Sequence, residues 1–271
     1  MALRDVRVGD TMLSVTEVGE GSPIVFLHAF PLHAQMWAPQ LDALPAGWRG
    51  VAPDLRGFRA STGAPARSVG DHAADVLALI ASLDAGPVVL AGLSMGGYVA
   101  FECWRRHPAA IRGLVLADTR ADADSDEARA RRVAMQGLAR TSGTGAVIDA
   151  MLPGLLGATT QTDEPHLAHE VRRWATETPG SAVADALEAL RTRPDSRPTL
   201  ATIAVPTLVL VGAEDVLTPP AVARVIADGI AGATLVEIPR AGHLSNVEHP
   251  AAFNGALQRW LATLRRGAST L

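Results

Sequence analysis

The sequence contains no lysine, and all 24 of its basic residues are arginine. Without lysine, the chain cannot form a Schiff base with a carbonyl substrate, and it lacks the basic residue of a lysine-dependent phosphate loop. Cysteine is nearly absent too, because Cys103 is the single one. One cysteine forms neither an internal disulfide nor a cage of cysteine ligands around a metal ion. These absences exclude several kinds of covalent, phosphate and metal chemistry.

Long apolar runs and a strong charge of one sign are also missing. No run reaches the ~18 consecutive apolar residues of a membrane-spanning helix, and residues 1–10 lack the apolar stretch of a signal peptide. The net charge of −4 comes without a basic tract, which argues against nucleic acid as the main partner. With 48% hydrophobic and 19% charged residues, we expect a globular, cytoplasmic protein with no membrane span.

Short apolar runs recur along the chain and predict the strands of a sheet. Two alternating stretches, 3–8 and 12–18, are separated by Gly9-Asp10 and predict an opening hairpin. Further runs are bounded by glycine, proline or polar residues and lie at 24–27, 50–52, 88–91, 114–117, 207–211 and 234–238. Helical patterns lie between them, at 68–83, 98–106, 220–230 and 250–264. This alternation predicts an α/β fold with a mostly parallel central sheet flanked by helices.

One block interrupts the alternation. Between residues 120 and 193 only helical patterns occur, at 125–139, 144–156, 164–176 and 182–192. A proline-bearing connector then precedes Pro206, where the strand pattern resumes. We therefore expect residues 1–119 and 194–271 to form the α/β core, and residues 120–193 to form an inserted helical cap over the sheet.

The strongest local pattern is Gly92-Leu93-Ser94-Met95-Gly96, which lies directly after a buried strand pattern and directly before a helical one. G-x-S-x-G in this context is typical of a serine nucleophile, because the sharp turn exposes the serine oxygen above the sheet. The N-terminus of the following helix favours developing negative charge. The alternative is that Ser94 merely caps the helix. The position of the segment favours the nucleophile.

Four other motifs are specific by their order and spacing in the chain. They are His28-Ala29-Phe30-Pro31, Asp54-Leu55-Arg56-Gly57, Gly212-Ala213-Glu214-Asp215 and Gly242-His243. With the Ser94 segment, they make nearly the whole chain resemble the α/β-hydrolase superfamily. Within it, the chain is similar to the cap-bearing esterases, the 3-oxoadipate enol-lactonases and the cofactor-free haloperoxidases. The resemblance implies an α/β-hydrolase fold and a catalytic triad of Ser94, Asp215 and His243, in the chain order of the family.

The base and the acid each have an alternative in the sequence. His243 follows the last strand pattern, in a loop that can reach the serine, whereas His249 begins a surface helix. Asp215 follows the run 207–211, where the family carries its acid. Asp118 ends the preceding strand pattern, where some members of the superfamily keep theirs. We favour Asp215 over Asp118.

An oxyanion hole is also implied by the resemblance. The backbone N–H groups of Met95 and Phe30 would hold the negative oxygen that forms on the substrate. This chain has Ala29 where the family usually has glycine, and Arg59 at another position where glycine is common. We expect His28 to be structural, and Arg59 either to face the entrance or to be solvated.

The candidates for a substrate pocket are mostly the apolar side chains of the expected cap, although each could equally belong to the core of the cap. They are Trp37, Met135, Met151, Leu152, Leu155 and Trp174. His166 and His169 lack an obvious third ligand, so we expect no metal site. We also expect no cofactor.

These patterns predict a serine hydrolase that cleaves a small carboxylic ester or lactone through an acyl-enzyme intermediate. One alternative is haloperoxidase-like perhydrolysis, in which peroxide replaces water at the same residues. Another is a small-molecule receptor or regulator that retains the triad but works by binding a partner. A serine at position 94 disfavours haloalkane dehalogenases and epoxide hydrolases, whose families use aspartate there.

Overall fold

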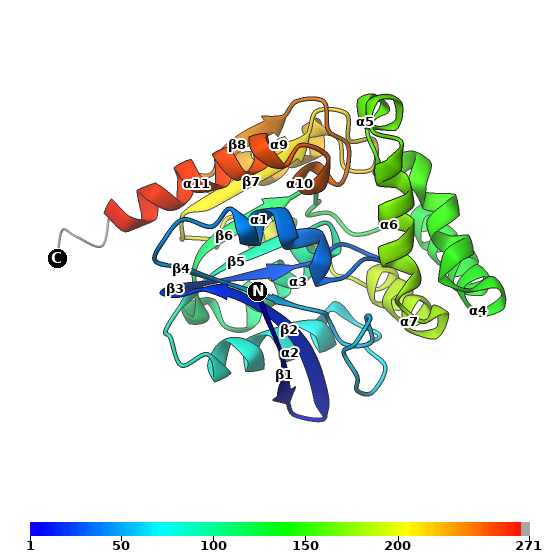
Figure 1. The fold of residues 1–271 in the computed structure, drawn as a ribbon, viewed down its shortest axis with the longest axis horizontal. Helices are drawn as coiled ribbons and strands as arrows, with labels where there is room; N and C mark the ends of the chain where they lie inside the picture. Colours follow the sequence, from blue (N-terminus) through cyan, green and yellow to red (C-terminus); the bar gives the residue numbers. More distant parts are fainter. Residues whose placement is uncertain (267–271) are drawn as a thin grey trace.

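The computed structural model describes residues 1–266 and contains an eight-stranded sheet (Figure 1). Its strands are β1 (Ala2–Val8), β2 (Thr11–Gly19), β3 (Ser22–Leu27), β4 (Trp48–Pro53), β5 (Val88–Leu93), β6 (Ile111–Ala117), β7 (Thr207–Gly212) and β8 (Thr234–Ile238). Their order in the sheet is β1-β2-β4-β3-β5-β6-β7-β8. Strand β2 pairs antiparallel with β1 and with β4, and all the other neighbouring strands pair parallel. The predicted opening hairpin and the mostly parallel sheet are therefore both confirmed.

Most helices pack on the two faces of this sheet. They are η1 (Ala34–Trp37), α1 (Ala38–Asp42), α2 (Val69–Ser82), α3 (Met95–Arg106), η2 (Pro108–Ala110), α8 (Arg197–Leu200), α9 (Pro220–Gly229), α10 (Ser245–Glu248) and α11 (Pro250–Arg266). The helix predicted over 68–83 is α2, which begins with a capping box between Ser68 and Asp71. Within residues 1–266, no helix has both the length and the apolar composition that crossing a membrane requires.

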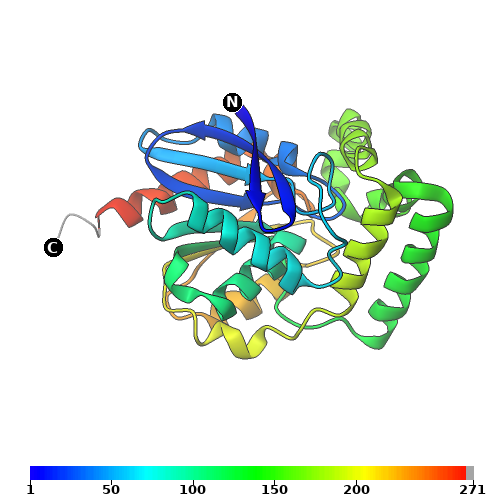
Figure 2. The ribbon, with the colours of Figure 1, turned by 90° about the horizontal axis from the view of Figure 1, so that it is seen from below.

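Four helices between β6 and β7 lie together beyond the carboxyl ends of the parallel strands (Figures 1 and 2). These inserted helices are α4 (Asp126–Leu155), α5 (Ala158–Asp163), α6 (His166–Thr176) and α7 (Gly180–Arg191). The two helical patterns predicted over 125–139 and 144–156 form α4, which is kinked at Gly143, where φ is 76°. Helix α5 was not predicted, because its short polar sequence carries no apolar stripe.

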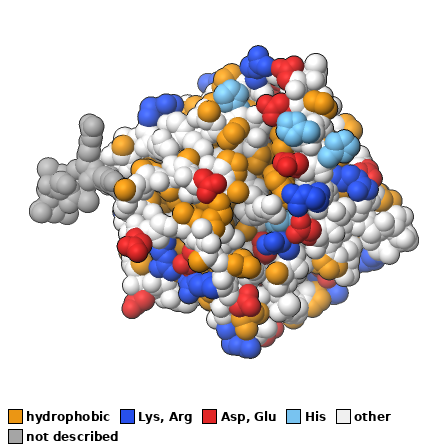
Figure 3. All heavy atoms as spheres, in the orientation of Figure 1, with side chains coloured by type: hydrophobic (Ala, Val, Ile, Leu, Met, Phe, Trp, Pro, Cys, Tyr) orange, Lys and Arg blue, Asp and Glu red, His pale blue; other side chains and the backbone are white. Residues whose placement is uncertain are grey.

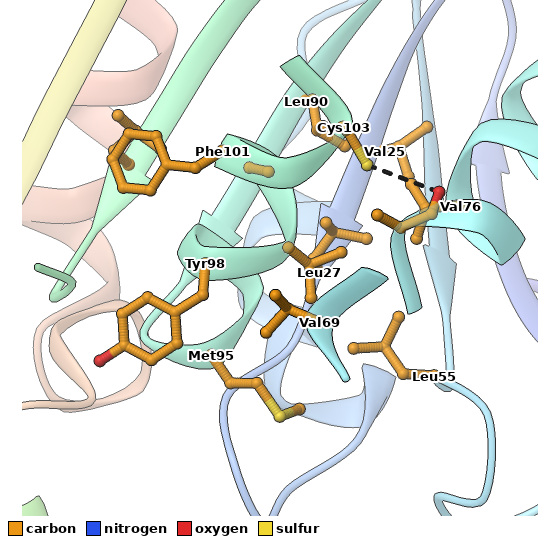
Figure 4. Close-up of a cluster of buried hydrophobic side chains, with 14 of the residues drawn as sticks. Val25, Leu27, Leu55, Val69, Val76, Leu90, Met95, Tyr98, Phe101 and Cys103 are labelled. Carbon is orange, nitrogen blue, oxygen red and sulfur yellow. Dashed lines mark hydrogen bonds between the residues drawn. The ribbon is translucent and has the colours of Figure 1, made fainter. Parts of the chain in front are cut away.

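Alternate side chains of each central strand point into two separate hydrophobic cores. Figure 4 shows part of one core, in which Val25 and Leu90 of the sheet pack near Val76 of α2 and Cys103 of α3. The Cys103 thiol donates a hydrogen bond to the backbone oxygen of Ala73 at 3.8 Å, and burial raises the pKa of this thiol. Cys103 is therefore an inert packing residue, as a thiol and not a thiolate.

The opposite face of the sheet carries a core rich in aromatic side chains. The ring of Trp37 lies 5.1 Å from that of Phe26 and 6.0 Å from that of Phe253, which α11 contributes. Fully burying a side chain of this size contributes about 1.5–3 kcal/mol. Because both faces are covered, the central strands carry continuous apolar runs, such as Val88–Leu93 of β5, in which every residue is buried.

The two chain crossings between the core and the inserted helices are joined to each other. The Arg193 guanidinium donates to the Asp124 carboxylate at 2.5 Å, and both side chains are almost fully buried. The same guanidinium stacks over the ring of Tyr98, with its central carbon 4.4 Å from the ring centroid. The Ser196 N–H also donates to the oxygen of Ala121 at 2.7 Å. The inserted helices thus leave and re-enter the core at one fixed point.

Arg193→Met tests this point by removing the ion pair while keeping an apolar stem. Because Asp124 would stay buried with only Arg132 at 3.3 Å, we expect the free energy of unfolding to fall by about 3–5 kcal/mol in urea denaturation. Arg197→Met is the matched control, since Arg197 pairs with Asp195 at the surface and should contribute little. Equal effects of the two substitutions would contradict the importance of the buried pair.

Candidate active site

Ser94 lies at the turn between β5 and α3 with a left-handed backbone (φ 52°, ψ −110°), which a residue with a side chain adopts only under strain. Its N–H donates to the oxygen of Ala117 at 2.9 Å, which fixes the turn against β6. A Cβ atom at Gly92 would overlap the oxygen of Gly96, and one at Gly96 would overlap the oxygen of Leu27. The glycine spacing around Ser94 is therefore a requirement of backbone packing.

His243 brings the loop after β8 to the Ser94 hydroxyl. The distance from His243 Nε2 to Ser94 Oγ is 2.8 Å, and the distance from His243 Nδ1 to Asp215 Oδ2 is also 2.8 Å. An ionised carboxylate only accepts hydrogen bonds, so Nδ1 donates to Asp215, and Nε2 accepts the serine proton. The three residues that the sequence singled out as a triad therefore form one continuous chain of hydrogen bonds.

Asp215 is held in place by the turn that follows β7. Its Oδ1 accepts the N–H groups of Leu217 (2.8 Å) and Thr218 (2.9 Å), and its Oδ2 accepts the Thr218 hydroxyl at 2.6 Å. Burial alone would raise the pKa of this carboxyl, but the neighbouring His243 and these hydrogen bonds outweigh it, so the pKa lies below its ordinary value. Asp215 is therefore ionised and points both of its oxygens at fixed donors.

Asp118, the alternative acid, has different partners. Its Oδ1 accepts the N–H of Gly212 at 2.8 Å, and its Oδ2 accepts the hydroxyl of Ser245 at 2.5 Å. Complete burial and then the negative charge of Asp215 raise the pKa of the Asp118 carboxyl well above its ordinary value. Asp118 thus joins the loop of the acid to the loop of the histidine, and its hydrogen bonds within residues 1–266 do not include His243.

The two backbone N–H groups expected to bind an oxyanion lie on either side of Ser94. Phe30 follows β3 and lines the same cavity as Ser94, and Met95 is the first residue of α3. Within residues 1–266, neither N–H donates to a backbone or side-chain acceptor. Ala29 does not have a positive φ, so alanine fits here without the strain that a left-handed conformation would impose.

His28 holds this loop, as expected of a structural histidine. Its Nε2 accepts the N–H of Leu55 at 2.9 Å, and its Nδ1 donates to the oxygen of Ala29 at 3.0 Å. Burial is the largest cause that lowers the pKa of His28, to about 3. The ring is therefore neutral. A neutral imidazole has one donor and one acceptor nitrogen, as these two hydrogen bonds require.

Arg59 joins the core to the inserted helices. Its N–H donates to the hydroxyl of Thr178 at 3.2 Å, its Nε donates to Glu177 at 2.9 Å, and its guanidinium lies 3.6 Å from Asp54. Charged side chains of both signs gather on the surface of this region (Figure 3). Arg59 was expected either to face the entrance or to be solvated. It is not a free solvated side chain, because it is anchored to the end of α6.

A cavity of about 370 Å³ opens above Ser94 and His243. Tyr98 of α3 and the acid-loop residue Leu217 form part of its wall, and the inserted helices form most of the rest. The helical residues are Ala128, Arg131, Arg132, Met135, Ala150, Met151, Gly154 and Leu190. This volume lies in the range typical of pockets that bind small organic molecules.

Of the predicted pocket residues, Met135 and Met151 line this cavity. The other four lie elsewhere: Trp37, Leu155 and Trp174 are buried in the aromatic-rich core and its extension into the inserted helices, and Leu152 packs against them. The difference depends on packing. Met151 is only partly buried and lines the cavity, whereas Leu155, one helical turn further along α4, is 1% exposed within the core.

Sequence reasoning missed several residues that shape the site. Leu217 could have been found as an exposed leucine two positions after Asp215, and Leu190 from the apolar stripe of α7. Glu248 gave no signal, because its side chain bonds only to backbone N–H groups. His166 and His169 are both exposed on α6, and the described residues hold no group of three or more side chains that could bind a metal ion.

Comparisons with known proteins agree with this fold. The sequence profile of the alpha/beta hydrolase fold family matches residues 22–250. The chain is 29% identical to 3-oxoadipate enol-lactonase 2 of Acinetobacter baylyi, over 92% of each chain. A thermophilic esterase from Thermogutta terrifontis superposes with a TM-score of 0.92 and 34% identity, covering 97% of this chain and 99% of the esterase.

The enol-lactonase from Burkholderia xenovorans LB400 is a second similar structure. It has a TM-score of 0.88 and 32% identity, and the match covers 96% of this chain and 100% of the lactonase. The profile spans β3 to β8 with the inserted helices and the loops around Ser94, and the relative and the two structures each match more than nine tenths of the chain. The chain therefore belongs to the α/β-hydrolase fold family.

Proposed function

We propose that this protein hydrolyses a small carboxylic ester or lactone through an acyl-enzyme intermediate on Ser94. The observation that carries the proposal is the hydrogen-bonded chain from Ser94 through His243 to Asp215, which opens into a cavity of ligand size. The relatives that are named esterases and enol-lactonases support the same reaction class. The reaction uses no cofactor.

The first half of the reaction forms the acyl-enzyme. Ser94 Oγ attacks the carbonyl carbon while its proton moves to His243 Nε2, and Asp215 stabilises the imidazolium that results. The carbonyl oxygen becomes an oxyanion and accepts hydrogen bonds from the N–H groups of Phe30 and Met95. When the intermediate collapses, the proton on His243 passes to the departing alkoxide. In a lactone, the alcohol stays attached as part of the ring-opened acyl chain.

The second half releases the acid. A water molecule gives its proton to His243 Nε2 and attacks the acyl carbon, and the same two N–H groups hold the second oxyanion. When this intermediate collapses, the bond between the acyl carbon and Ser94 Oγ breaks, His243 returns the proton to Oγ, and the acid leaves. Each step moves one proton between His243 and an oxygen, so one base serves both halves.

We propose further that residues 120–193 act as a cap that selects the substrate, with residues 1–119 and 194–271 as the hydrolase core; residues 267–271 lie outside the described residues. Most of the cavity wall opposite Ser94 comes from α4 and α7. The acyl or alcohol group of a bound substrate would therefore contact these helices and not the sheet. Met135 and Met151 supply flexible apolar contacts there.

Ser94→Ala removes the oxygen that forms the acyl bond. We expect the variant to lose all labelling by a fluorophosphonate probe, and to lose ester turnover by about 10³-fold or more. Labelling is measured by intact-protein mass, and thermal unfolding serves as the control for folding. A Ser94→Ala protein that is labelled like the wild type would contradict the assignment.

The acid is tested by comparing kcat for Asp215→Asn with kcat for Asp118→Asn at the same pH. Asp215→Asn should lose at least ~10³-fold in kcat, because the histidine loses its orientation and the stabilisation of its cation. Asp118→Asn should lose less than ~10-fold, because an amide resembles the protonated carboxyl that its raised pKa favours. The opposite result would make Asp118 the acid.

Met151→Ala tests the cap as the element that selects the substrate. The smaller side chain widens the cavity, so the ratio of kcat/KM for a long acyl ester to that for a short one should rise about fivefold or more. Val133→Ala, at an exposed position of the same helix, is the matched control and should leave the ratio unchanged. If neither Met151→Ala nor Met135→Ala alters the ratio, the inserted helices do not select the substrate.

A further inference from the structure

We infer that Glu248 is a positioning residue for His243, and that it couples the alignment of this histidine to the seating of the cap. Glu248 is the last residue of α10 and is 6% exposed. It does not contact the reacting atoms. Its role depends on the hydrolysis proposed above, because it acts through the histidine that moves the proton.

The Glu248 carboxylate accepts hydrogen bonds from backbone groups on both sides of His243. Its Oε2 accepts the N–H of Gly242 at 3.0 Å, and its Oε1 accepts the N–H of Leu244 at 2.9 Å. The backbone of the histidine is therefore clamped from one buried carboxylate. An error of about 1 Å in placing a catalytic group can cost ~10²-fold in rate, so a clamp at this point bears on the reaction.

The same carboxylate reaches the cap. Glu248 Oε2 also accepts the N–H of Gly157, between α4 and α5, at 2.7 Å. The remaining N–H of the clamped segment, that of His243, donates to the oxygen of Leu155 at the end of α4 at 3.1 Å. All three N–H groups of residues 242–244 are thus held either by Glu248 or by the cap.

The backbones of the cap and of the histidine loop are in direct contact here. A Cβ atom at Gly242 would overlap the nitrogen of Gly157, and a Cβ at Gly157 would lie 2.8 Å from the nitrogen of Gly242. A shift of the cap at Gly157 therefore transmits to the histidine loop without any intervening side chain. Glu248 is hydrogen-bonded both to the cap, at Gly157, and to the histidine loop, at Gly242 and Leu244, so its hydrogen bonds change when the cap shifts.

The geometry requires a carboxylate and not an amide. Among the described side chains, no arginine or histidine forms an ion pair with Glu248, so its charge is stabilised by three N–H donors. A glutamine has one acceptor oxygen, and its NH₂ group would face one of the N–H donors. Glu248→Gln would therefore break one side of the clamp and place two donors against each other, at nearly unchanged volume.

Glu248→Gln is compared with the wild type by the rate constant for Ser94 labelling with a small fluorophosphonate, and by kcat and KM for a short acyl ester. Both are measured where circular dichroism shows each protein to be folded. We expect the labelling rate constant and kcat to fall together by about 10-fold to 100-fold, with KM changed less than about threefold. A purely structural role would lower the unfolding temperature and leave these rates of the folded protein unchanged.

The neighbouring Glu214 provides the matched control. The Glu214 carboxylate accepts from the N–H (2.8 Å) and the hydroxyl (2.5 Å) of Thr159 and from the N–H of Ala158, so this carboxylate holds the cap. Among the described residues, it accepts no hydrogen bond from residues 242–244. Glu214→Gln should label at the wild-type rate. Glu248→Asp, which keeps the charge but is one methylene shorter, should lose rate like Glu248→Gln and replaces it if the glutamine variant does not fold.

Two results would overturn the inference. One is a folded Glu248 variant that labels at the wild-type rate. The other is an equal loss in Glu214→Gln, which would assign the effect to the attachment of the cap in general. Failure of the proposed hydrolysis looks different, because then the wild type is not labelled at Ser94 at all.

Discussion

The site depends on one constraint, the common edge at which the parallel strands of the sheet end. Ser94, Asp215 and His243 follow β5, β7 and β8, and strands that run in the same direction deliver all three to that edge. The loops meet closely enough that a Cβ atom at Gly212 would overlap the oxygen of Gly242. Residues 149 positions apart in the chain can therefore share a hydrogen bond of 2.8 Å. The apolar strands that form this edge are as necessary to the proposed chemistry as the polar side chains beyond it.

Three buried carboxylates lie around the histidine, and burying a negative charge costs free energy. Each of the three has different surroundings that offset or avoid this cost. Asp215 accepts four hydrogen bonds, one of them from His243, and these interactions keep its pKa low. Glu248 is surrounded by backbone N–H groups. Asp118 has a raised pKa, chiefly because it is buried and then because of the negative charges of Asp215 and Glu248, and it bridges the acid and histidine loops. The three carboxylates have different surroundings and therefore different roles. Asp215 orients the histidine, whereas Asp118 and Glu248 hold the loops.

Most of the fold could be predicted because its signals are local. Buried parallel strands give continuous apolar runs, and the glycine spacing around Ser94 forms a short motif, although the backbone that excludes a Cβ atom at Gly96 belongs to Leu27 of β3. The face of α4 that lines the cavity could not be predicted, because the kink at Gly143 and the packing of α7 set which residues point inward; Met151 and Leu152 look alike in the sequence. Glu248 left no pattern, since a side chain that accepts backbone N–H groups places no demand on the residue types of its partners.

The most direct test of the account is a crystal structure of the protein after reaction with a small alkyl fluorophosphonate. The account predicts a bond from phosphorus to Ser94 Oγ, and a phosphonyl oxygen within about 2.7–3.1 Å of the nitrogens of both Phe30 and Met95. The alkyl group should extend into the cavity beside Met135 and Met151. Phosphorus bound to another residue, or a phosphonyl oxygen turned away from both N–H groups, would contradict the proposed mechanism.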